Sequence, residues 1–314
     1  MTEKINIKLT ELNRIKSIYS ILGIPAKAQV KDFDFSSCYE FKYCKKNHGD
    51  GHKETKKERI NRYLSVNKSG SRVIDEIPAN GLKKDYRPII NYKKDSGWLK
   101  KSQRIVHKFL VSAFNDVEYL HSTIKEKSYA SNGHAHCDGN KYIFAIDLSD
   151  FFTQINFDRV YKTIKYGLNL NKNTATFYAS LLTCPLEKGS KNLVLGQGLP
   201  SSPILAYWTN KSLFDYIYNI SNKNGINLTV YVDDITFSSK DYISQEFIDN
   251  ILGLFRKNGL KIKRKKTHYY KSTSIKKVTG VYIKEGKPKV SHNKHEEIFT
   301  IYKEMIKIIH NEIN

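Results

Sequence analysis

Apolar residues recur at helical spacing at the start of the chain and become sparse soon afterwards. In the first 25 residues they stand three or four positions apart, which predicts a helix with one apolar face. The residues of this face are Leu9, Leu12, Ile15, Tyr19 and Leu22. Residues 31–70 are polar and lysine-rich, which indicates an irregular insertion with little core. Weak alternation over 73–90 predicts two strands joined by a loop, and Ser102 is the predicted N-cap of a helix.

The second half of the chain alternates short apolar runs with helical stripes. The run 142–146 predicts a buried strand that ends on Asp147, and 228–237 predicts a strand–turn–strand unit around Asp233 and Asp234. A further strand is predicted over 278–283. Helices are predicted over 158–183, from Pro203 to Ile217, from Ser244 to Gly259 and over 293–312. Strands and helices mixed with hairpins favour an α+β fold with an antiparallel sheet.

The charge balance points to a polyanionic partner. Among 314 residues, 53 Lys and Arg face 31 Asp and Glu, which leaves a net charge of +22. Nucleic acid would neutralise such a chain best, and an anionic membrane surface is the second choice. The 21 Tyr and 15 Phe supply aromatic faces on which bases can stack. The alternative is a basic soluble protein without such a partner.

The composition favours a cytoplasmic protein with no membrane association. No apolar run approaches the length of a transmembrane helix, and the start of the chain has no secretory signal. Four cysteines without disulfide-framework spacing, Cys38, Cys44, Cys137 and Cys184, fit a reducing cytosol. Cys38 and Cys44 are followed by His48 and His52, but ligands at such irregular spacing rarely bind zinc, and we do not expect it here.

Carboxylates at the ends of apolar strands are the sharpest chemical feature. Asp233 and Asp234 stand between two apolar runs, where bare burial would make them repel each other. Mg²⁺ removes that cost because it prefers hard oxygen ligands. Asp147 adds a carboxylate at the end of another strand, which is the arrangement that two-metal phosphoryl transfer requires. The alternatives are an ordinary Asp-Asp turn and a helix N-cap.

A glycine-rich loop over 196–203 precedes the helix that Pro203 begins. Its glycines allow close backbone approach, so Gln197 can lie near a nucleotide or a template base. The alternative is a plain turn followed by a cap.

Three motifs in this order resemble reverse transcriptases: Ile-Asp-Leu-Ser-Asp-Phe-Phe at 146–152, Gln-Gly-Leu-Pro-Ser-Ser-Pro at 197–203 and Tyr-Val-Asp-Asp at 231–234. Within that group the chain is similar to the bacterial retron type. Retron enzymes carry Asn-Ala-x-x-His before the first catalytic strand, where this chain has Asn132-Gly133-x-x-His136. Val278-Thr279-Gly280 matches the Val-Thr-Gly motif of the same group. The resemblance covers about 87–290.

The resemblance implies a right-hand polymerase with fingers, a palm built on an antiparallel sheet, and a short thumb. The implied divisions are an N-terminal helical segment at 1–30, fingers with a polar insertion at 31–140, a palm with interleaved fingers elements at 141–284 and an abbreviated thumb at 285–314. The thumb helix has the apolar residues Ile298, Ile301, Met305 and Ile308. They need burial, either on the palm or on an effector protein or second copy.

The resemblance also implies roles for single residues. Asp147, Asp233 and Asp234 would bind two Mg²⁺ ions, for which Mn²⁺ can substitute. Lys266, with Lys265 as second choice, would protonate the leaving pyrophosphate. The substrate-binding residues would be Arg87, Phe152, Gln197 and Gly198, with Phe152 as the steric gate against ribonucleotides and Arg72 as the alternative to Arg87. The RNA-binding residues would be Asn132, His136, Val278, Thr279 and Gly280.

By the same resemblance, the reaction is RNA-templated DNA synthesis from deoxynucleoside triphosphates. A dedicated structured non-coding RNA would serve as template and primer through an internal 2′-hydroxyl, the product would be an RNA–DNA hybrid, and an effector protein would join it in anti-phage defence. One alternative is another bacterial reverse transcriptase, such as a group II intron-like enzyme. The other is a non-catalytic RNA-binding scaffold subunit of a defence complex.

Overall fold

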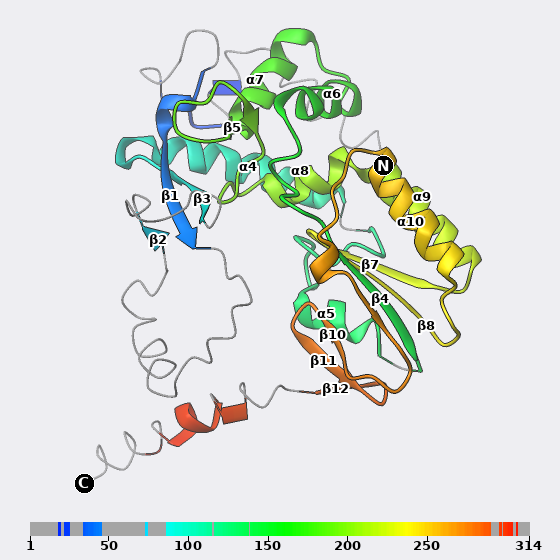
Figure 1. Cartoon of the computed structure of the whole chain (residues 1–314). Helices are drawn as coiled ribbons and strands as arrows, with labels where there is room; N and C mark the ends of the chain where they lie inside the picture. Colours follow the sequence, from blue (N-terminus) through cyan, green and yellow to red (C-terminus); the bar gives the residue numbers. More distant parts are fainter. Residues whose placement is uncertain are drawn as a thin grey trace. The chain divides into compact units, whose positions relative to one another are not determined.

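The computed structural model describes residues 18–19, 22–25, 34–45, 73–74, 86–114, 116–137, 139–289, 295–296, 298–303 and 306. For residues 44–45, 73–74 and 86–87 this description covers the backbone alone. The chain forms two compact units (Figure 1). The first unit contains Met1–Leu110 and Phe152–Thr209, and the second contains Val111–Phe151 and Asn210–Asn314.

The first unit combines a small antiparallel sheet with helices. Its three strands lie in the order β2 (Val73–Ile74), β1 (Tyr39–Lys45) and β3 (Tyr86–Tyr92). The helices are α4 (Gly97–Ala113, whose last turn belongs to the second unit), α6 (Phe157–Gly167), α7 (Lys172–Leu182) and α8 (Ser202–Thr209). A short hairpin of β5 (Cys184–Pro185) and β6 (Leu193–Val194) and the 3₁₀ turns η4 (Ser36–Cys38) and η7 (Lys94–Ser96) complete the unit.

Gln103 on α4 joins the elements of the first unit. Its buried amide nitrogen donates to the carbonyl of Leu181 on α7 at 2.7 Å and to the hydroxyl of Tyr39 on β1 at 2.9 Å. Its amide oxygen accepts a hydrogen bond from the hydroxyl of Tyr92 on β3. A buried amide is costly unless its groups are paired, so this network fixes helix and sheet together.

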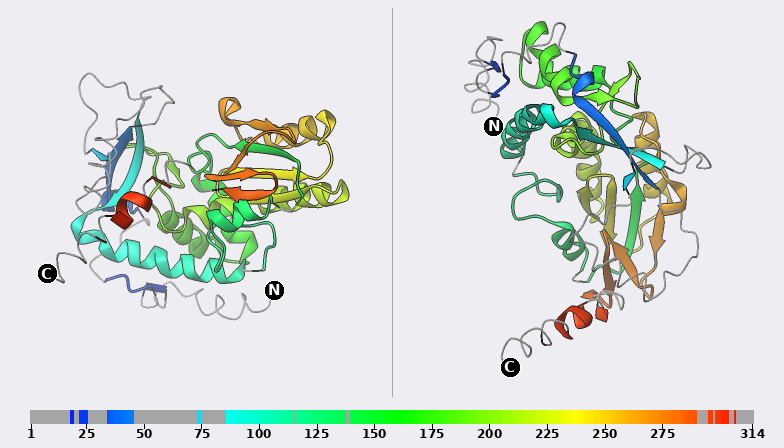
Figure 2. Two further views of the ribbon diagram at one scale, coloured as in Figure 1. Left: turned by 90° about the horizontal axis from the view of Figure 1, so that it is seen from below. Right: turned by 90° about the vertical axis from the view of Figure 1, so that its left-hand side faces the viewer.

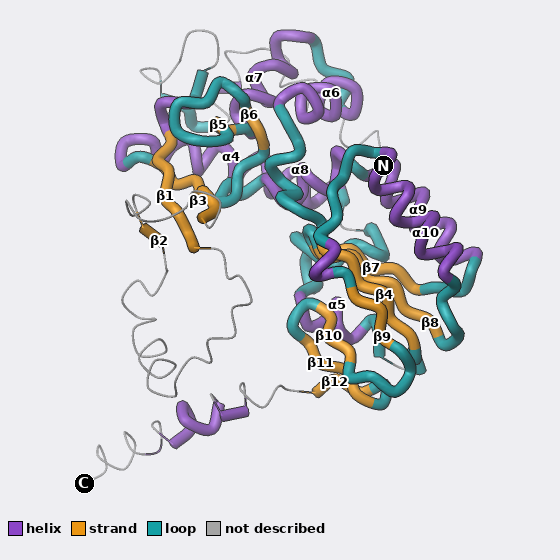
Figure 3. The backbone as a smooth tube through the Cα atoms, viewed as in Figure 1, coloured by secondary structure: helices purple, strands orange, loops and turns teal. Residues whose placement is uncertain are grey.

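The second unit is built on a four-stranded antiparallel sheet (Figure 3). The strands lie in the order β7 (Asn227–Tyr231), β8 (Asp234–Ser239), β4 (Tyr142–Asp147) and β9 (His268–Tyr270). Its helices are α5 (Tyr129–His134), α9 (Lys211–Lys223) and α10 (Gln245–Lys257), and η8 (Arg264–Lys266) is a 3₁₀ turn. A second sheet contains β10 (Lys276–Val278), β11 (Val281–Lys284) and β12 (Lys287–Lys289).

Both faces of the four-stranded sheet are covered. Neighbouring residues of β4 point to opposite faces, and each face packs against other elements. On one face Phe144 stacks on Phe237, whose ring also meets Phe247 of α10. On the other face Ile143 packs into a buried cluster with Cys137, Val278 and Ile283. The β10–β11 hairpin and α5 therefore lie side by side on this second face (Figure 2).

The predicted α+β class and antiparallel sheet are confirmed, as are the strand–turn–strand unit at 228–237 and the helix between Ser244 and Gly259. The side chain of Ser244 accepts a hydrogen bond from the backbone nitrogen of Phe247, as an N-cap should. The expected strand before Asp147 is β4, and the two expected around 73–90 are β2 and β3.

Five predictions of local structure were wrong. The region 31–70, expected to be irregular with little core, contains η4 and the strand β1, and its residues Phe35, Cys38 and Tyr39 are buried. Ser102 is not an N-cap: it lies inside α4, where its hydroxyl donates to the carbonyl of Leu22 at 2.8 Å. The helix predicted over 158–183 is interrupted at Asn169, which has a φ of +50°, and restarts with Asn171 as N-cap. The helix from Pro203 breaks at Asn210 into α8 and α9. The strand predicted over 278–283 is two strands, because Thr279 and Gly280 form a turn.

The predicted helices at the two ends of the chain lie partly outside the described residues. Tyr19 and Leu22 are buried as expected, whereas Leu9, Leu12 and Ile15 fall outside. At the other end residues 298–303 are helical, and Ile298 and Ile301 are 60% and 36% exposed. Met305 and Ile308 lie outside the description, so the predicted burial of this face stays a prediction. The domain boundaries at 30, 140 and 284 also stay predictions.

Gly133 allows α5 to approach the β10–β11 hairpin closely. A Cβ atom at this position would lie 2.6 Å from Cβ of Val281, and both Cγ atoms of that valine would lie within 2.9 Å. The chain has glycine where the retron pattern has alanine, and this contact with Val281 gives the physical reason.

We therefore expect Gly133→Ala to destabilise the protein by about 1–3 kcal/mol through overpacking, measured by urea unfolding. Val281→Gly removes the atoms that the new methyl group would meet, so the double variant should lose less stability than the two single changes summed. If the two losses simply add, the alanine does not act through this contact.

Candidate active site

Strand pairing brings the three predicted aspartates to one end of the four-stranded sheet. Asp147, the last residue of β4, lies directly opposite Asp234, the first residue of β8. Residues opposite each other in an antiparallel pair have Cβ atoms about 5 Å apart. Asp233 belongs to the β7–β8 turn, and its carbonyl accepts a hydrogen bond from the backbone nitrogen of Leu148 at 2.9 Å. The sheet itself therefore juxtaposes the carboxylates.

The turn that bears Asp233 contains backbone strain. Val232 has a φ of +58°, a region that β-branched residues rarely adopt. Its nitrogen donates to the hydroxyl of Ser122 at 3.2 Å, which helps to fix the turn. Strain of this kind persists where surrounding structure holds it, and it is concentrated at functional sites.

Burial, with a smaller contribution from neighbouring carboxylates, raises the pKa of Asp233 and of Asp234. Burial is the main reason that the pKa of Asp234 rises to about 6, and the charges of Asp233 and Asp147 add to the effect. Burial also raises the pKa of Asp233, with a further contribution from Asp147. Clustered, partly desolvated carboxylates of this kind favour a nearby cation.

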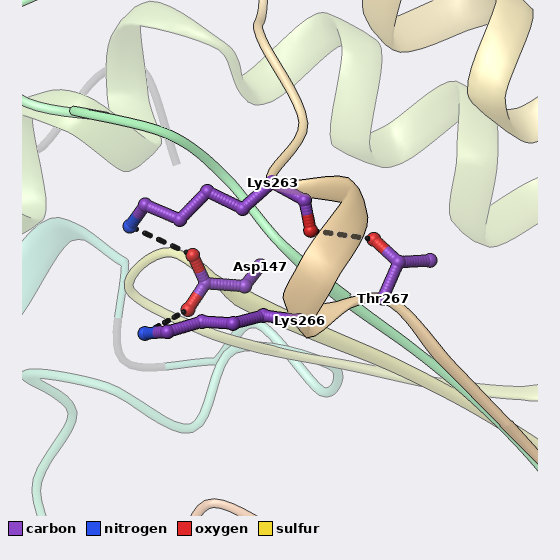
Figure 4. A network of polar contacts seen from close by, with 4 residues as sticks. All are labelled: Asp147, Lys263, Lys266 and Thr267. Carbon is purple, nitrogen blue, oxygen red and sulfur yellow. Dashed lines mark hydrogen bonds and ion pairs between the residues drawn. The ribbon is translucent and has the colours of Figure 1, made fainter. Parts of the chain in front are cut away.

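Two lysines supply positive charge to Asp147 (Figure 4). Nζ of Lys263 lies 2.8 Å from Oδ1 of Asp147, and Nζ of Lys266 lies 3.1 Å from Oδ2. The predicted Lys266 thus lies beside Asp147; it and its second choice, Lys265, are both exposed. Lys263 was missed by sequence reasoning, although its spacing of three from Lys266 could have revealed it.

A 3₁₀ turn explains why these two lysines act together. The backbone nitrogen of Lys266 donates to the carbonyl of Lys263 at 2.9 Å, and side chains three positions apart eclipse in such a turn. The hydroxyl of Thr267 donates to the same carbonyl at 3.2 Å. The backbone nitrogen of Lys263 in turn donates to the carbonyl of Asp147 at 2.9 Å. The turn is therefore fixed to the strand that ends on Asp147.

The donor set suits Mg²⁺, because three carboxylates at strand ends offer the hard oxygen atoms that this ion prefers. Among the described residues, however, no three acidic, histidine or cysteine side chains already converge on one point. Asp147 instead has both carboxylate oxygens directed at the lysines (Figure 4). Metal binding would need Asp147 to exchange these partners.

The predicted substrate-binding residues lie in the first unit. The carbonyl of Gln197 accepts a hydrogen bond from the nitrogen of Ile90 on β3 at 2.7 Å. Gly198 has a φ of +112°, and a Cβ there would lie 2.4 Å from the Ile90 carbonyl oxygen, so only glycine fits. Phe152 is half-buried, and Arg87 stands on β3 opposite Cys44. Arg72 lies outside the described residues, and the substrate roles stay predictions.

The predicted RNA-binding residues form internal contacts in the second unit. His136 is fully buried, with Nδ1 at 2.7 Å from the hydroxyl of Ser238 and Nε2 at 2.7 Å from that of Thr229. The amide nitrogen of Asn132 donates to the hydroxyl of Thr279 at 3.2 Å. These contacts show a structural role: His136 connects α5 to the four-stranded sheet, and Asn132 connects it to the hairpin.

Among the five predicted RNA-binding residues, Asn132, His136 and Val278 are buried, Thr279 is half-buried and Gly280 is exposed. Contact with RNA stays a prediction for all five. The possible zinc ligands are not tested either, because His48 and His52 lie outside the described residues. Cys38 is described and is buried. No helix among the described residues has the length and hydrophobicity needed to cross a bilayer.

Comparison with known proteins gives one family match that covers most of the chain. The profile of the family "Reverse transcriptase (RNA-dependent DNA polymerase)" matches residues 67–283. The chain is similar to the retron Ec86 reverse transcriptase of Escherichia coli, with 28% identity over 70% of this chain and 64% of that protein. It is also similar to the retron Se72 reverse transcriptase of Salmonella heidelberg, with 28% identity over 67% and 55%. The chain thus spans less than two thirds of the length of these relatives.

Among solved structures, an apo telomerase from Candida tropicalis, truncated from its C-terminal domain, has a TM-score of 0.44 and 12% identity. That likeness covers 66% of this chain and 52% of the telomerase.

The buried imidazole of His136 should make stability depend on pH. Burial lowers its pKa from 6.5 to about 3, so the folded protein keeps it neutral while the unfolded chain takes up a proton. The stabilisation is therefore complete above pH 6.5 and is lost as the pH falls towards 3. Urea unfolding at pH 7.5 and 5 should show a loss of about 2 kcal/mol from this residue.

His136→Gln cannot titrate, so its free energy of unfolding should fall less over that range than that of the unchanged protein. His268→Gln, at an exposed histidine, serves as the matched control and should keep the full fall. An equal fall in all three proteins would show that His136 contributes nothing to the pH dependence.

Proposed function

Because the chain belongs to the reverse transcriptase (RNA-dependent DNA polymerase) family and is of the retron type, we propose that it copies RNA into DNA by two-metal phosphoryl transfer. Family membership also confirms the predicted right-hand polymerase fold. The single observation that carries the proposal is the strand register that places Asp147 opposite Asp234, with Asp233 in the adjoining turn.

In this proposal the three aspartates, Lys266 and Phe152 have separate tasks. Asp147, Asp233 and Asp234 would hold Mg²⁺, which when bound activates the attacking hydroxyl and neutralises charge on the leaving pyrophosphate. Lys266 is positioned beside Asp147 and carries a proton that it can give to a leaving oxygen. Phe152, in the first unit, is our proposed gate against ribonucleotides.

The retron type supports a specific substrate and partners. We propose a dedicated structured non-coding RNA that serves as template and, through an internal 2′-hydroxyl, as primer, which yields an RNA–DNA hybrid. A net charge of +22 suits such a polyanion. We further propose a cytoplasmic role in anti-phage defence with an associated effector protein.

A second candidate is a non-catalytic RNA-binding scaffold of the same fold. The raised pKa values of Asp233 and Asp234 argue against it, because a scaffold has no use for desolvated carboxylates that repel one another. Another bacterial reverse transcriptase, of the group II intron-like kind, would share the chemistry but not the dedicated RNA.

Asp233→Asn should reduce DNA synthesis at least about a thousandfold, because it removes a metal ligand while keeping the shape of the side chain. The assay is primer extension on a primed RNA template with Mg²⁺ and deoxynucleoside triphosphates. Asp241→Asn removes the same charge at an exposed position and should leave the rate within about twofold.

RNA binding by Asp233→Asn should persist, since lysines and arginines rather than this carboxylate contact phosphates. Near-normal synthesis by Asp233→Asn would overturn the metal assignment. An unchanged protein that binds RNA but extends no primer would favour the scaffold.

A further inference from the structure

We propose that Lys263 and Lys266 form a cation pair that competes with divalent metal for Asp147, and that Lys263 sets the metal affinity of the free chain. The proposal rests on the proposed function, since it assumes that Asp147 is a metal ligand. It adds a role for Lys263, a residue outside the three polymerase motifs, and explains how a carboxylate cluster can exist before its metal arrives.

Both oxygens of the Asp147 carboxylate already have a cationic partner. Lys263 contacts Oδ1 at 2.8 Å and Lys266 contacts Oδ2 at 3.1 Å (Figure 4). The Asp147 side chain is only 11% exposed, so little solvent-facing surface is left for a further cation. A metal ion can therefore use this carboxylate only by displacing at least one ammonium group.

Lys266 donates a hydrogen bond to Oδ2 of Asp147, whereas Lys263 contacts Oδ1 as an ion pair without hydrogen-bond geometry. Lys263 is nevertheless the competitor that is better shielded from water. Its side chain is 34% exposed, against 61% for Lys266, and ion pairs gain strength as water is excluded from them. Its backbone nitrogen also donates to the Asp147 carbonyl at 2.9 Å. The residue thus contacts Asp147 with both its main chain and its side chain.

Charge balance explains what this competition achieves. Three ionised carboxylates facing two ammonium groups leave one negative charge, which is a weak attraction for a divalent ion in water. An incoming triphosphate brings several negative charges of its own, which attract the metal and offer the lysines other partners. Metal binding is then favoured with the nucleotide and disfavoured without it.

The test is a Mn²⁺ titration of the full chain without nucleic acid or nucleotide, followed by electron paramagnetic resonance of the free ion. Lys263→Gln removes the competing charge and should tighten Mn²⁺ binding by roughly three- to tenfold. Lys263→Arg keeps the charge and should bind Mn²⁺ as the unchanged protein does. Arg264→Gln removes an equal charge from the same turn at an exposed position and should change the affinity less than about twofold.

Equal affinities of Lys263→Gln and Arg264→Gln would overturn the proposal, as would weaker binding by Lys263→Gln. Thermal unfolding of each variant verifies that it is folded, which we expect because no side chain altered here is fully buried. Asp233→Asn in the same titration separates the two levels of the argument. If Asp233→Asn abolishes Mn²⁺ binding while Lys263→Gln leaves the affinity unchanged, only the competition fails. If Asp233→Asn itself leaves the affinity unchanged, the metal assignment fails, and the competition that rests on it fails too.

Discussion

The pairing of β4 with β8 is the constraint on which the rest of the site depends. It places Asp147 opposite Asp234 and leaves Asp233 in the turn beyond, so three carboxylates share one end of the sheet. Their mutual repulsion costs folding free energy, which the protein offsets locally with Lys263 and Lys266. The strained φ of Val232 belongs to the same arrangement, because this residue forms the turn that presents Asp233.

The packing beneath the sheet fixes that register. A one-residue slip of β4 would turn Ile143 and Phe144 to the wrong faces, away from the cluster around Val278 and from the ring of Phe237. His136 strengthens the same region through hydrogen bonds to Thr229 on β7 and Ser238 on β8. The motifs at 132–136 and 278–280, which resemble those of retron enzymes, also contact each other: the amide nitrogen of Asn132 donates to the hydroxyl of Thr279.

The strands β4, β7 and β8 and the three aspartates could be predicted from the sequence because each carboxylate directly follows or precedes an apolar run. The features that escaped prediction depend on contacts between distant residues or on single-residue conformations. Ser102 resembled an N-cap, but its hydroxyl bonds to Leu22 in another segment. The turn at Thr279 and Gly280 was hidden inside an apolar run, and the break at Asn169 depends on one positive φ. Lys263 was missed because its spacing of three from Lys266 becomes informative only once the segment is known to form a 3₁₀ turn.

The central claim is that Asp147, Asp233 and Asp234 hold the catalytic metals. Metal-directed backbone cleavage tests it most directly. Fe²⁺ replaces Mg²⁺ in the full chain bound to a primed RNA template and a deoxynucleoside triphosphate, and peroxide then generates hydroxyl radicals that cut the backbone near the ion. We predict fragments that end close to Asp147 and close to Asp233, and their suppression by excess Mg²⁺. Cuts confined to other segments, or cuts that Mg²⁺ does not suppress, would contradict the account.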